Sequence, residues 1–245
     1  MQIDIYSDPH LYDAAHTWKT NDIEFITNCA LEHGGPILEM ASGTGRLAVP
    51  LIKKGFNYTG VELSEQFVEF TKKKLTLINS DHRIVQGDMK SIDLKKEYQF
   101  IFIGFNSICH LLTNHDLSAF FNCVYAHLMD GGLFLIDTFV PNPIFLYRPK
   151  RKTYVMEFDL PNGERCIVNE INKYDPDTQI NQIKWFFEHE SSTADQFLFD
   201  MHMIYPDTMD RLLSESGFKI LNKFGDYNKS PFNSESHLQI YLCTK

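Results

Sequence analysis

The sequence contains no closely spaced pair of cysteines. Its five cysteines are spread over 245 residues, and the two nearest, Cys109 and Cys123, are fourteen residues apart. Zinc sites and disulfide frameworks usually show close cysteine spacing or an even cysteine set, so we expect neither. We expect no other metal either, because the remaining candidate ligands show no ligand spacing; they are His115, His189, His202 and His237.

Basic residues are in the minority, and long apolar runs are missing. The 23 Lys and Arg residues stand against 32 Asp and Glu residues, a formal charge of −9. Nucleic-acid backbones are bound by clustered cations, so we expect no nucleic-acid partner. Apolar stretches such as residues 100–105 fall far short of the roughly 20 residues of a membrane span, and residues 1–18 lack the apolar core of a secretory signal. We therefore expect a cytoplasmic protein that binds no membrane.

Apolar residues, by contrast, are abundant enough for a large core. They make up 43% of the chain, with 20 Phe and 11 Tyr. Between residues 36 and 140, short apolar runs alternate with segments of helical periodicity, which is typical of βαβ units and a parallel sheet. The predicted strands are 36–40, 58–63, 83–86, 98–105 and 132–139, and the predicted helices are 22–32, 46–54, 64–78 and 114–128.

After Pro141 the pattern changes to strand-like segments joined by short turns. They cover residues 152–159, 165–173, 179–190 and 196–205. Strands this close must be antiparallel, because a parallel crossover needs about a dozen residues. A helix over 206–216 and two strands, 218–224 and 237–244, are predicted to complete the chain. We divide it into a cap segment and core (1–140), an antiparallel insertion that covers the site (141–205), and a segment that completes the core sheet (206–245).

Residues 36–48 combine a strand, a turn with two glycines and a helix start. Glycines at such a turn let a ligand approach backbone that carries no Cβ. Acidic residues follow the first three strands: Glu39 ends the first, Glu62 ends the second, and Asp88 lies just past the third. Glu62 follows Gly43 by nineteen residues, which suits a carboxylate that accepts hydrogen bonds from ribose hydroxyls, and ligands of open α/β sheets bind at this edge.

Two classes of ligand fit these residues. Gly43, Gly45 and Ala48 satisfy the dinucleotide pattern, in which a pyrophosphate rests on the helix start, so an NAD(P)-dependent dehydrogenase is one alternative. The carboxylate of Glu39, however, would repel a diphosphate. The same carboxylate suits the ammonium and sulfonium groups of S-adenosylmethionine (SAM).

These motifs resemble those of class I SAM-dependent methyltransferases, in the small-molecule branch that includes sugar-amine and toxoflavin-type heterocycle N-methyltransferases. Residues 37–46 resemble the first motif of that family, residues 60–64 the second, residues 87–89 the adenine-contacting turn, and residues 130–134 the turn before the fifth strand. The resemblance implies an α/β fold: a Rossmann-like, mostly parallel seven-stranded sheet with helices on both faces and an antiparallel β insertion after the fifth strand.

The resemblance also implies which residues bind SAM and its product, S-adenosylhomocysteine. The glycine turn would wrap the amino-acid end beside Glu39, Glu62 would hold the ribose, Leu63 would pack on the adenine, and Asp88 would accept from the adenine amino group. The full set is Glu39, Ala41, Ser42, Gly43, Gly45, Arg46, Glu62, Leu63, Gly87, Asp88, Met89 and Phe105. Ala41 stands where the family usually has a glycine.

Methyl transfer from a sulfonium depends mainly on alignment of the reactants, and a base is needed only if the acceptor arrives protonated. Tyr6 and Tyr12 in the N-terminal segment and His110 after the fourth strand are the candidate catalytic residues. Their alternative roles are those of amphipathic surface tyrosines and a hydrogen-bonded core histidine. Asp137, at the end of the fifth strand, faces either the site or a helix start.

The insertion carries aromatic residues that are expected to form an apolar lid where they face the site, or otherwise the insertion's own core; they are Tyr154, Phe158, Trp185, Phe186 and Phe187. The basic cluster Arg148, Lys150, Arg151 and Lys152 is expected to be a solvated hinge. We predict methyl transfer to nitrogen, less favourably to oxygen, of a small-molecule acceptor, preferably a planar heterocycle, by a monomer or homodimer. A catalytically silent interaction protein is the second alternative.

Overall fold

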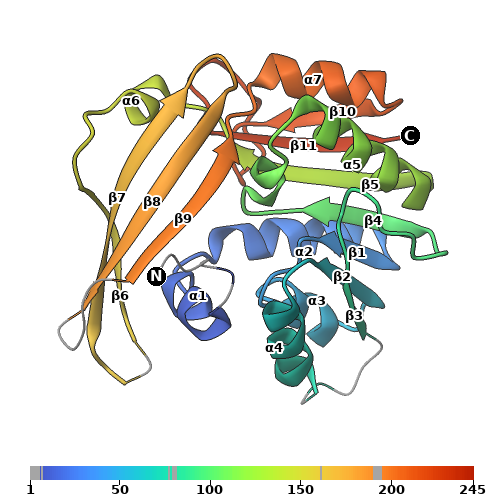
Figure 1. Ribbon diagram of the computed structural model, residues 1–245. Coiled ribbons are helices and arrows are strands. Elements are labelled where there is room, and N and C mark those ends of the chain that lie inside the picture. The colour runs from blue at the N-terminus through green and yellow to red at the C-terminus, as the bar shows by residue number, and fades with distance from the viewer. Residues whose placement is uncertain (1–5, 7, 77, 79–81, 161, 190–194) are drawn as a thin grey trace.

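The computed structural model describes residues 6, 8–76, 78, 82–160, 162–189 and 195–245. Its large sheet has seven strands in the order β10-β11-β5-β4-β1-β2-β3 (Figure 1). Neighbours from β5 to β3 are parallel, and β11 runs antiparallel to both β5 and β10. The expected Rossmann-like sheet is thereby confirmed. The strands are β1 Ile37–Met40, β2 Tyr58–Glu62, β3 His82–Gln86, β4 Tyr98–Ile103, β5 Leu128–Phe139, β10 Lys219–Phe224 and β11 Leu238–Thr244.

Helices cover both faces of this sheet (Figure 1). Along β4, Phe100 and Phe102 belong to one apolar cluster with α2, α3 and α4, whereas Ile101 and Ile103 belong to another with α5 and α7. Successive side chains of a strand point to opposite faces, so both sets are buried, and residues 100–103 of β4 form an apolar run. The helices are α2 Asn21–His33, α3 Ala48–Lys53, α4 Glu65–Leu75, α5 Asn114–His127 and α7 Pro206–Glu215.

A second, antiparallel sheet has the order β6-β7-β8-β9 and stands apart from the large sheet, beside α1 (Figure 1). It contacts the large unit through α1 and through η2, the 3-10 turn that follows β4. The predicted antiparallel insertion is therefore confirmed. The elements are α1 Pro9–Ala15, η2 Ser107–His110, α6 Pro143–Leu146, β6 Thr153–Asp159, β7 Arg165–Asp175, β8 Ile180–His189 and β9 Asp195–His202.

Several elements differ from the prediction, among them the following three. The helix expected over 46–54 begins only at Ala48, because the glycine turn extends to Leu47. The strand expected over 196–205 ends at His202, after which the backbone carbonyl of Ile204 accepts a hydrogen bond from Gln239 of β11. Helix α1 was not predicted, although Asp8 caps it and Pro9 opens it, and both residue types favour helix starts.

Candidate active site

The turn after β1 has an unusual backbone. Ala41, Gly43 and Gly45 have φ values of 56°, 55° and 77°, in the left-handed region where a side chain costs about 1–2 kcal/mol. A Cβ on Gly45 would lie 2.7 Å from Cγ2 of Thr71, whereas one on Gly43 would meet nothing within 4 Å. Gly45 is thus required by helix α4, while Gly43 faces open space that a ligand can approach. The left-handed Ala41 explains why a glycine is usual at this position.

Glu62 links the end of β2 to the glycine turn. Its Oε2 accepts a hydrogen bond from the Gly43 backbone N–H at 2.9 Å, and its Oε1 accepts one from the Ser64 N–H at 2.8 Å. The residue is 8% exposed, and burial raises its pKa while both N–H groups oppose that shift. The carboxylate is therefore fixed beside the turn and has lone pairs left for a ligand.

The adenine end predicted from the motifs lies next to Glu62. Leu63 is 67% exposed and borders the same cavity as Gly87, Asp88 and Met89. The Gly87 N–H donates to the Glu62 carbonyl at 2.9 Å. The structure thus brings these four residues together on one cavity wall, where Leu63 provides an apolar side chain and Asp88 a carboxylate.

Glu39, at the first strand end, is buried in a smaller cavity. It is 5% exposed and accepts a hydrogen bond from the Tyr58 hydroxyl. Burial raises its pKa to about 8. Ser42, which is also buried, borders the same cavity. A cationic group in this cavity would meet a carboxyl that ionises readily once a positive charge is beside it.

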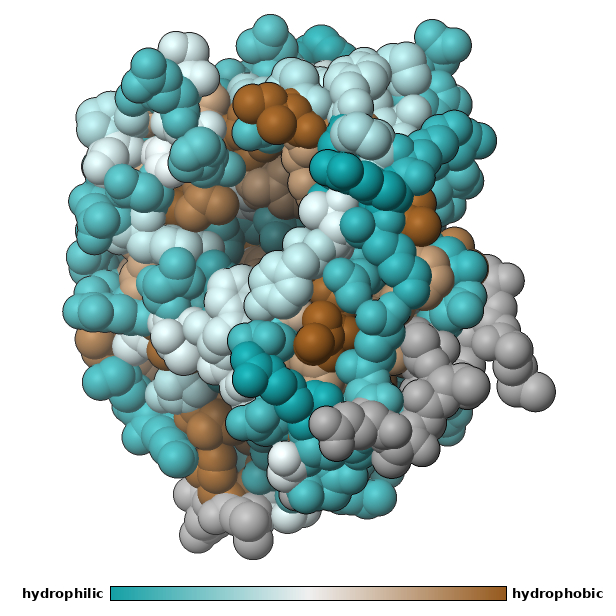
Figure 2. Space-filling model, turned by 90° about the vertical axis from the view of Figure 1, so that its left-hand side faces the viewer, coloured by the Kyte–Doolittle hydropathy of each residue, from teal (hydrophilic) through white to brown (hydrophobic). Residues whose placement is uncertain are grey.

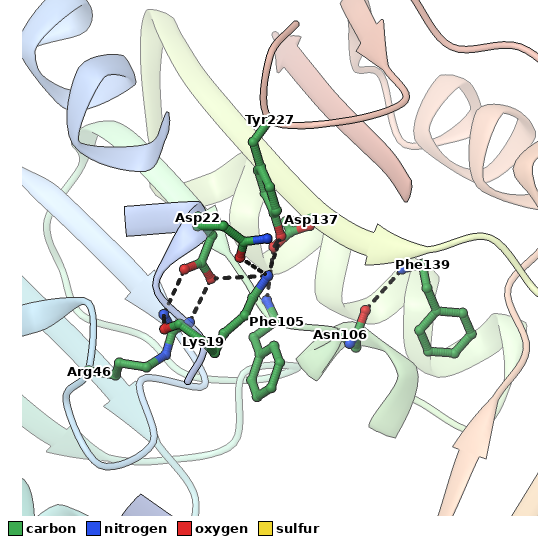
Figure 3. Close-up of polar contacts among 9 residues, drawn as sticks. Lys19, Asp22, Arg46, Phe105, Asn106, Asp137, Phe139 and Tyr227 are labelled. Atoms are coloured by element: carbon green, nitrogen blue, oxygen red, sulfur yellow. Dashed lines mark hydrogen bonds and ion pairs between the residues drawn. The ribbon is translucent and has the colours of Figure 1, made fainter. Parts of the chain in front are cut away.

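The guanidinium of Arg46 is bound by α2 (Figure 3). Its Nη1 and Nη2 each donate to a carboxylate oxygen of Asp22 at 2.7 Å, and Nη1 also donates to the Lys19 carbonyl at 2.9 Å. Asp22 is fully buried. Arg46 borders the smaller cavity, but Asp22 neutralises its charge, and the sequence did not reveal this partner. Its contact with the cofactor stays a prediction.

A second polar network supports the turn after β4 (Figure 3). Phe105 and Asn106 have φ values of 51° and 62°, and Oδ2 of Asp137 accepts from the Phe105 N–H at 3.2 Å and from the Tyr227 hydroxyl at 2.9 Å. Lys19 donates to that hydroxyl at 2.7 Å. Asp137 thus holds the Phe105 turn in place. Tyr227 and Lys19 were not among the predicted site residues.

Two adjoining cavities cover this edge of the sheet. The smaller has a volume of about 320 Å³ and the larger about 850 Å³. They meet at shared wall residues: Tyr12, His16, Ala41, Gly43, Phe105 and Ser107. Glu39 borders the smaller cavity, whereas Glu62 and Asp88 border the larger. All the residues expected to bind a cofactor therefore line one or both of these adjoining cavities.

The three candidate catalytic residues lie together on the wall of the larger cavity. The Tyr6 hydroxyl and Nε2 of His110 are 2.7 Å apart and share a hydrogen bond. The Tyr12 ring lies 5.9 Å from that of Tyr6 and 4.1 Å from that of His16. Burial raises the pKa of Tyr12 to about 12 and lowers the pKa of His16 to about 4, so both are uncharged near neutral pH. His16 was missed by the sequence reasoning.

The aromatic residues of the insertion divide between two roles. Trp185 borders the larger cavity, and Phe158 and Phe187 pack in an apolar cluster that the insertion shares with α1 and to which Trp185 also contributes. Tyr154 is 58% exposed, and Phe186 packs under Lys152 and Lys184. Figure 2 shows apolar residues in brown around a recess on the side where the antiparallel sheet stands.

Arg148 is not part of a solvated hinge, contrary to the prediction. Its Nη2 pairs with Glu170 and its Nε donates to Asn172 at 2.6 Å. Its side chain is only 15% exposed, because Arg148 follows α6, and α6 packs against strand β7. Among the described residues, no group of three or more His, Cys, Asp or Glu side chains is placed to hold a metal ion, and no helix is long and apolar enough to cross a membrane.

Comparison with known proteins agrees with this geometry. Residues 37–132 match the family model described as a methyltransferase domain. The solved CcbJ methyltransferase from Streptomyces caelestis has a TM-score of 0.83 at 22% identity, covering 98% of both chains, and an S-adenosylmethionine-dependent methyltransferase from Clostridium acetobutylicum ATCC 824 has 0.76 at 19% identity, covering 96% of both. A dTDP-3-amino-3,4,6-trideoxy-alpha-D-glucopyranose N,N-dimethyltransferase from Streptomyces venezuelae is 26% identical over 119 residues, 49% of this chain and 48% of its own. The resemblance found in the motifs is confirmed.

Proposed function

Because the chain carries a methyltransferase domain on the fold of SAM-dependent methyltransferases, we propose that it transfers the methyl group of SAM to a nitrogen of a small molecule. One observation carries this proposal. Glu39, Glu62 and Asp88, which follow three neighbouring strands, border two adjoining cavities that share the glycine turn as a wall. This arrangement matches a ligand that is cationic at one end, hydroxylated in the middle and planar at the other.

The residues present fit that cofactor. Gly43 leaves open space for its approach, and Glu62 offers a fixed carboxylate to the ribose hydroxyls. Leu63 and Asp88 provide an apolar contact and an acceptor for the adenine. Glu39 would bind the ammonium from the wall of the smaller cavity. When bound, the cofactor would supply an electrophilic methyl group on sulfur for displacement by the acceptor nitrogen, with S-adenosylhomocysteine as the leaving group.

The protein's own contribution is to align the acceptor and to receive a proton. An amine that arrives protonated must lose a proton before its lone pair can attack. Burial holds His16 neutral, and the hydrogen bond between Tyr6 and His110 places a proton acceptor on the wall of the larger cavity. His110 would accept the proton, and Tyr6 would orient the imidazole and the acceptor.

Nitrogen is favoured over oxygen because the sugar relative is an N,N-dimethyltransferase by name. Among nitrogen acceptors, a planar heterocycle suits the aromatic wall formed by Trp185 and Phe199. Their rings are arranged edge to face, with centroids 5.1 Å apart.

Calorimetric titration with SAM and S-adenosylhomocysteine tests the cofactor assignment, and methyl transfer to a panel of amines and heterocycles tests the reaction. We expect micromolar binding of both cofactor forms and transfer to at least one nitrogen acceptor. No binding of either form would refute the proposal. Binding without transfer would favour the silent interaction protein, and a change in NADPH fluorescence on mixing would favour the dehydrogenase.

A further inference from the structure

The side of the larger cavity formed by the antiparallel sheet is almost entirely apolar. Among the described residues of that sheet, seven border the cavity: Val155, Met156, Glu170, Ile183, Trp185, Phe199 and Met201. Glu170 is the one with a charged side chain. A single buried carboxylate in an apolar wall must be held by specific partners, because burying an unpaired charge is costly.

Glu170 has two such partners. It stands directly opposite Trp185 in the ladder between β7 and β8, so both side chains lie on the same face of the sheet. The Trp185 Nε1–H donates to Oε2 at 2.7 Å, and the Arg148 guanidinium pairs with Oε1. Glu170 is 3% exposed, and burial raises its pKa. Each oxygen accepts one bond here, and a carboxylate has about four acceptor sites, so a ligand donor can still bind.

The charges around the whole cavity are unfavourable for anions. Its described wall includes the acids Glu62, Glu65, Asp88 and Glu170, whereas Lys90 is the one lysine or arginine. Lys90 is itself engaged, with its Nζ 2.9 Å from Asp116 and 3.8 Å from Asp88. A phosphate or carboxylate on the acceptor would therefore meet acids and no cation that is available to neutralise it, and like charges at close range oppose binding.

We propose that the acceptor is an apolar nitrogen compound without phosphate or carboxylate, which donates an N–H group to Glu170 and packs against Trp185. This inference rests on the proposed methyl transfer. It separates the acceptor of this chain from the nucleotide-linked sugar that the relative's name gives, because that compound carries a diphosphate. Glu170 and Trp185 then determine acceptor specificity at the wall opposite the cofactor.

A pair of probes with the same apolar skeleton tests the charge preference. Phenethylamine and 3-phenylpropionate are titrated calorimetrically into the protein loaded with S-adenosylhomocysteine. We expect the amine to bind at least tenfold more tightly than the carboxylate. Equal affinities, a preference for the carboxylate, or no binding of either probe would overturn the inference.

Two substitutions change the ratio of the probe affinities in opposite directions. Glu170→Gln leaves the Arg148 charge uncompensated, so the ratio should shift at least tenfold towards the carboxylate. Arg148→Met removes the positive charge, so the ratio should shift towards the amine. Glu188→Gln is the matched control, because Glu188 pairs with Lys152 away from the cavity, and its ratio should equal that of the unaltered protein.

Folding and cofactor binding are checked in the same series. Thermal unfolding shows whether each variant is folded, and the comparison of probes on the unaltered protein decides the question even if Glu170→Gln does not fold. Failure to bind S-adenosylhomocysteine would refute the proposed function itself. Normal cofactor binding with identical ratios in Glu170→Gln and Glu188→Gln would refute only the acceptor assignment.

Discussion

Replacing Glu62 by Gln tests the link between the glycine turn and the cofactor. Glu62 accepts two backbone hydrogen bonds, from Gly43 and Ser64, through different carboxylate oxygens. A glutamine keeps one oxygen, and its NH₂ group then faces one of the two N–H donors. One hydrogen bond to a charged group is lost, and a partly buried N–H is left without an acceptor.

The expected magnitudes follow from that geometry. A hydrogen bond to a charged group contributes about 1.5–3 kcal/mol, so the free energy of unfolding should fall by about that amount. For a protein of this size, this corresponds to roughly 3–12 °C in the unfolding midpoint. If the ribose hydroxyls also bind this carboxylate, S-adenosylhomocysteine should bind roughly 10- to 150-fold more weakly.

Calorimetry of S-adenosylhomocysteine binding and thermal unfolding of the ligand-free protein measure the two effects separately. Glu69→Gln is the control, since its carboxylate lies on the exposed face of α4 and pairs loosely with Lys72 at 3.4 Å; both quantities should stay unchanged. A Glu62→Gln variant with a lower midpoint and an unaltered affinity would show that Glu62 only braces the turn. An unaltered midpoint would contradict the two backbone hydrogen bonds.

Three further substitutions test other parts of the site. Asp22→Asn leaves the Arg46 guanidinium without its carboxylate partner, so urea denaturation should show a free energy of unfolding lower by about 3 kcal/mol. This value is at the lower end of the range for a buried ion pair, because the Arg46 side chain is 20% exposed. A loss below about 1 kcal/mol would contradict a structural role of the pair. Glu39 has an ordinary pKa of 4.5 that burial raises to about 8, so the folded protein binds the extra proton between these values. The contribution of this proton to stability is fully present below about pH 4.5 and is lost as pH rises through 8, by at most about 1.4 kcal/mol per pH unit. The free energy of unfolding in urea of the unaltered protein, minus that of Glu39→Gln, should therefore decline from about pH 5 to about pH 9. A difference that does not change with pH would refute the raised pKa. Tyr6→Phe removes the hydroxyl bonded to His110, so kcat should fall at least tenfold with little change in S-adenosylhomocysteine affinity, and an unchanged rate would remove Tyr6 from the mechanism.

The residues proposed to bind the cofactor could be placed at one edge of the sheet from the sequence, because they follow consecutive parallel strands. Such strands end at one edge of a sheet, so positions along the chain translate directly into neighbours in space. Glu39, Glu62 and Asp88 were found in this way. The burial of Arg46 could not be, because its partner Asp22 lies on α2, 24 residues earlier, and the pairing depends on how that helix crosses the sheet.

The prediction for the proposed acceptor side of the cavity failed for a different reason. A charged residue in a basic run predicts solvent exposure, and Arg148 was assigned to a hinge on that ground. Its burial depends on Glu170, which in turn depends on the register between β7 and β8. That register is unbroken from the Asp175–Ile180 pair to the Cys166–His189 pair, so the turn that joins the two strands sets it. The observed turn between Asp175 and Ile180 thus places Glu170 opposite Trp185. The predicted strand ends, residues 173 and 179, would have placed Glu170 opposite Gln182, so a shift in the bounds of this turn was enough to hide the pair.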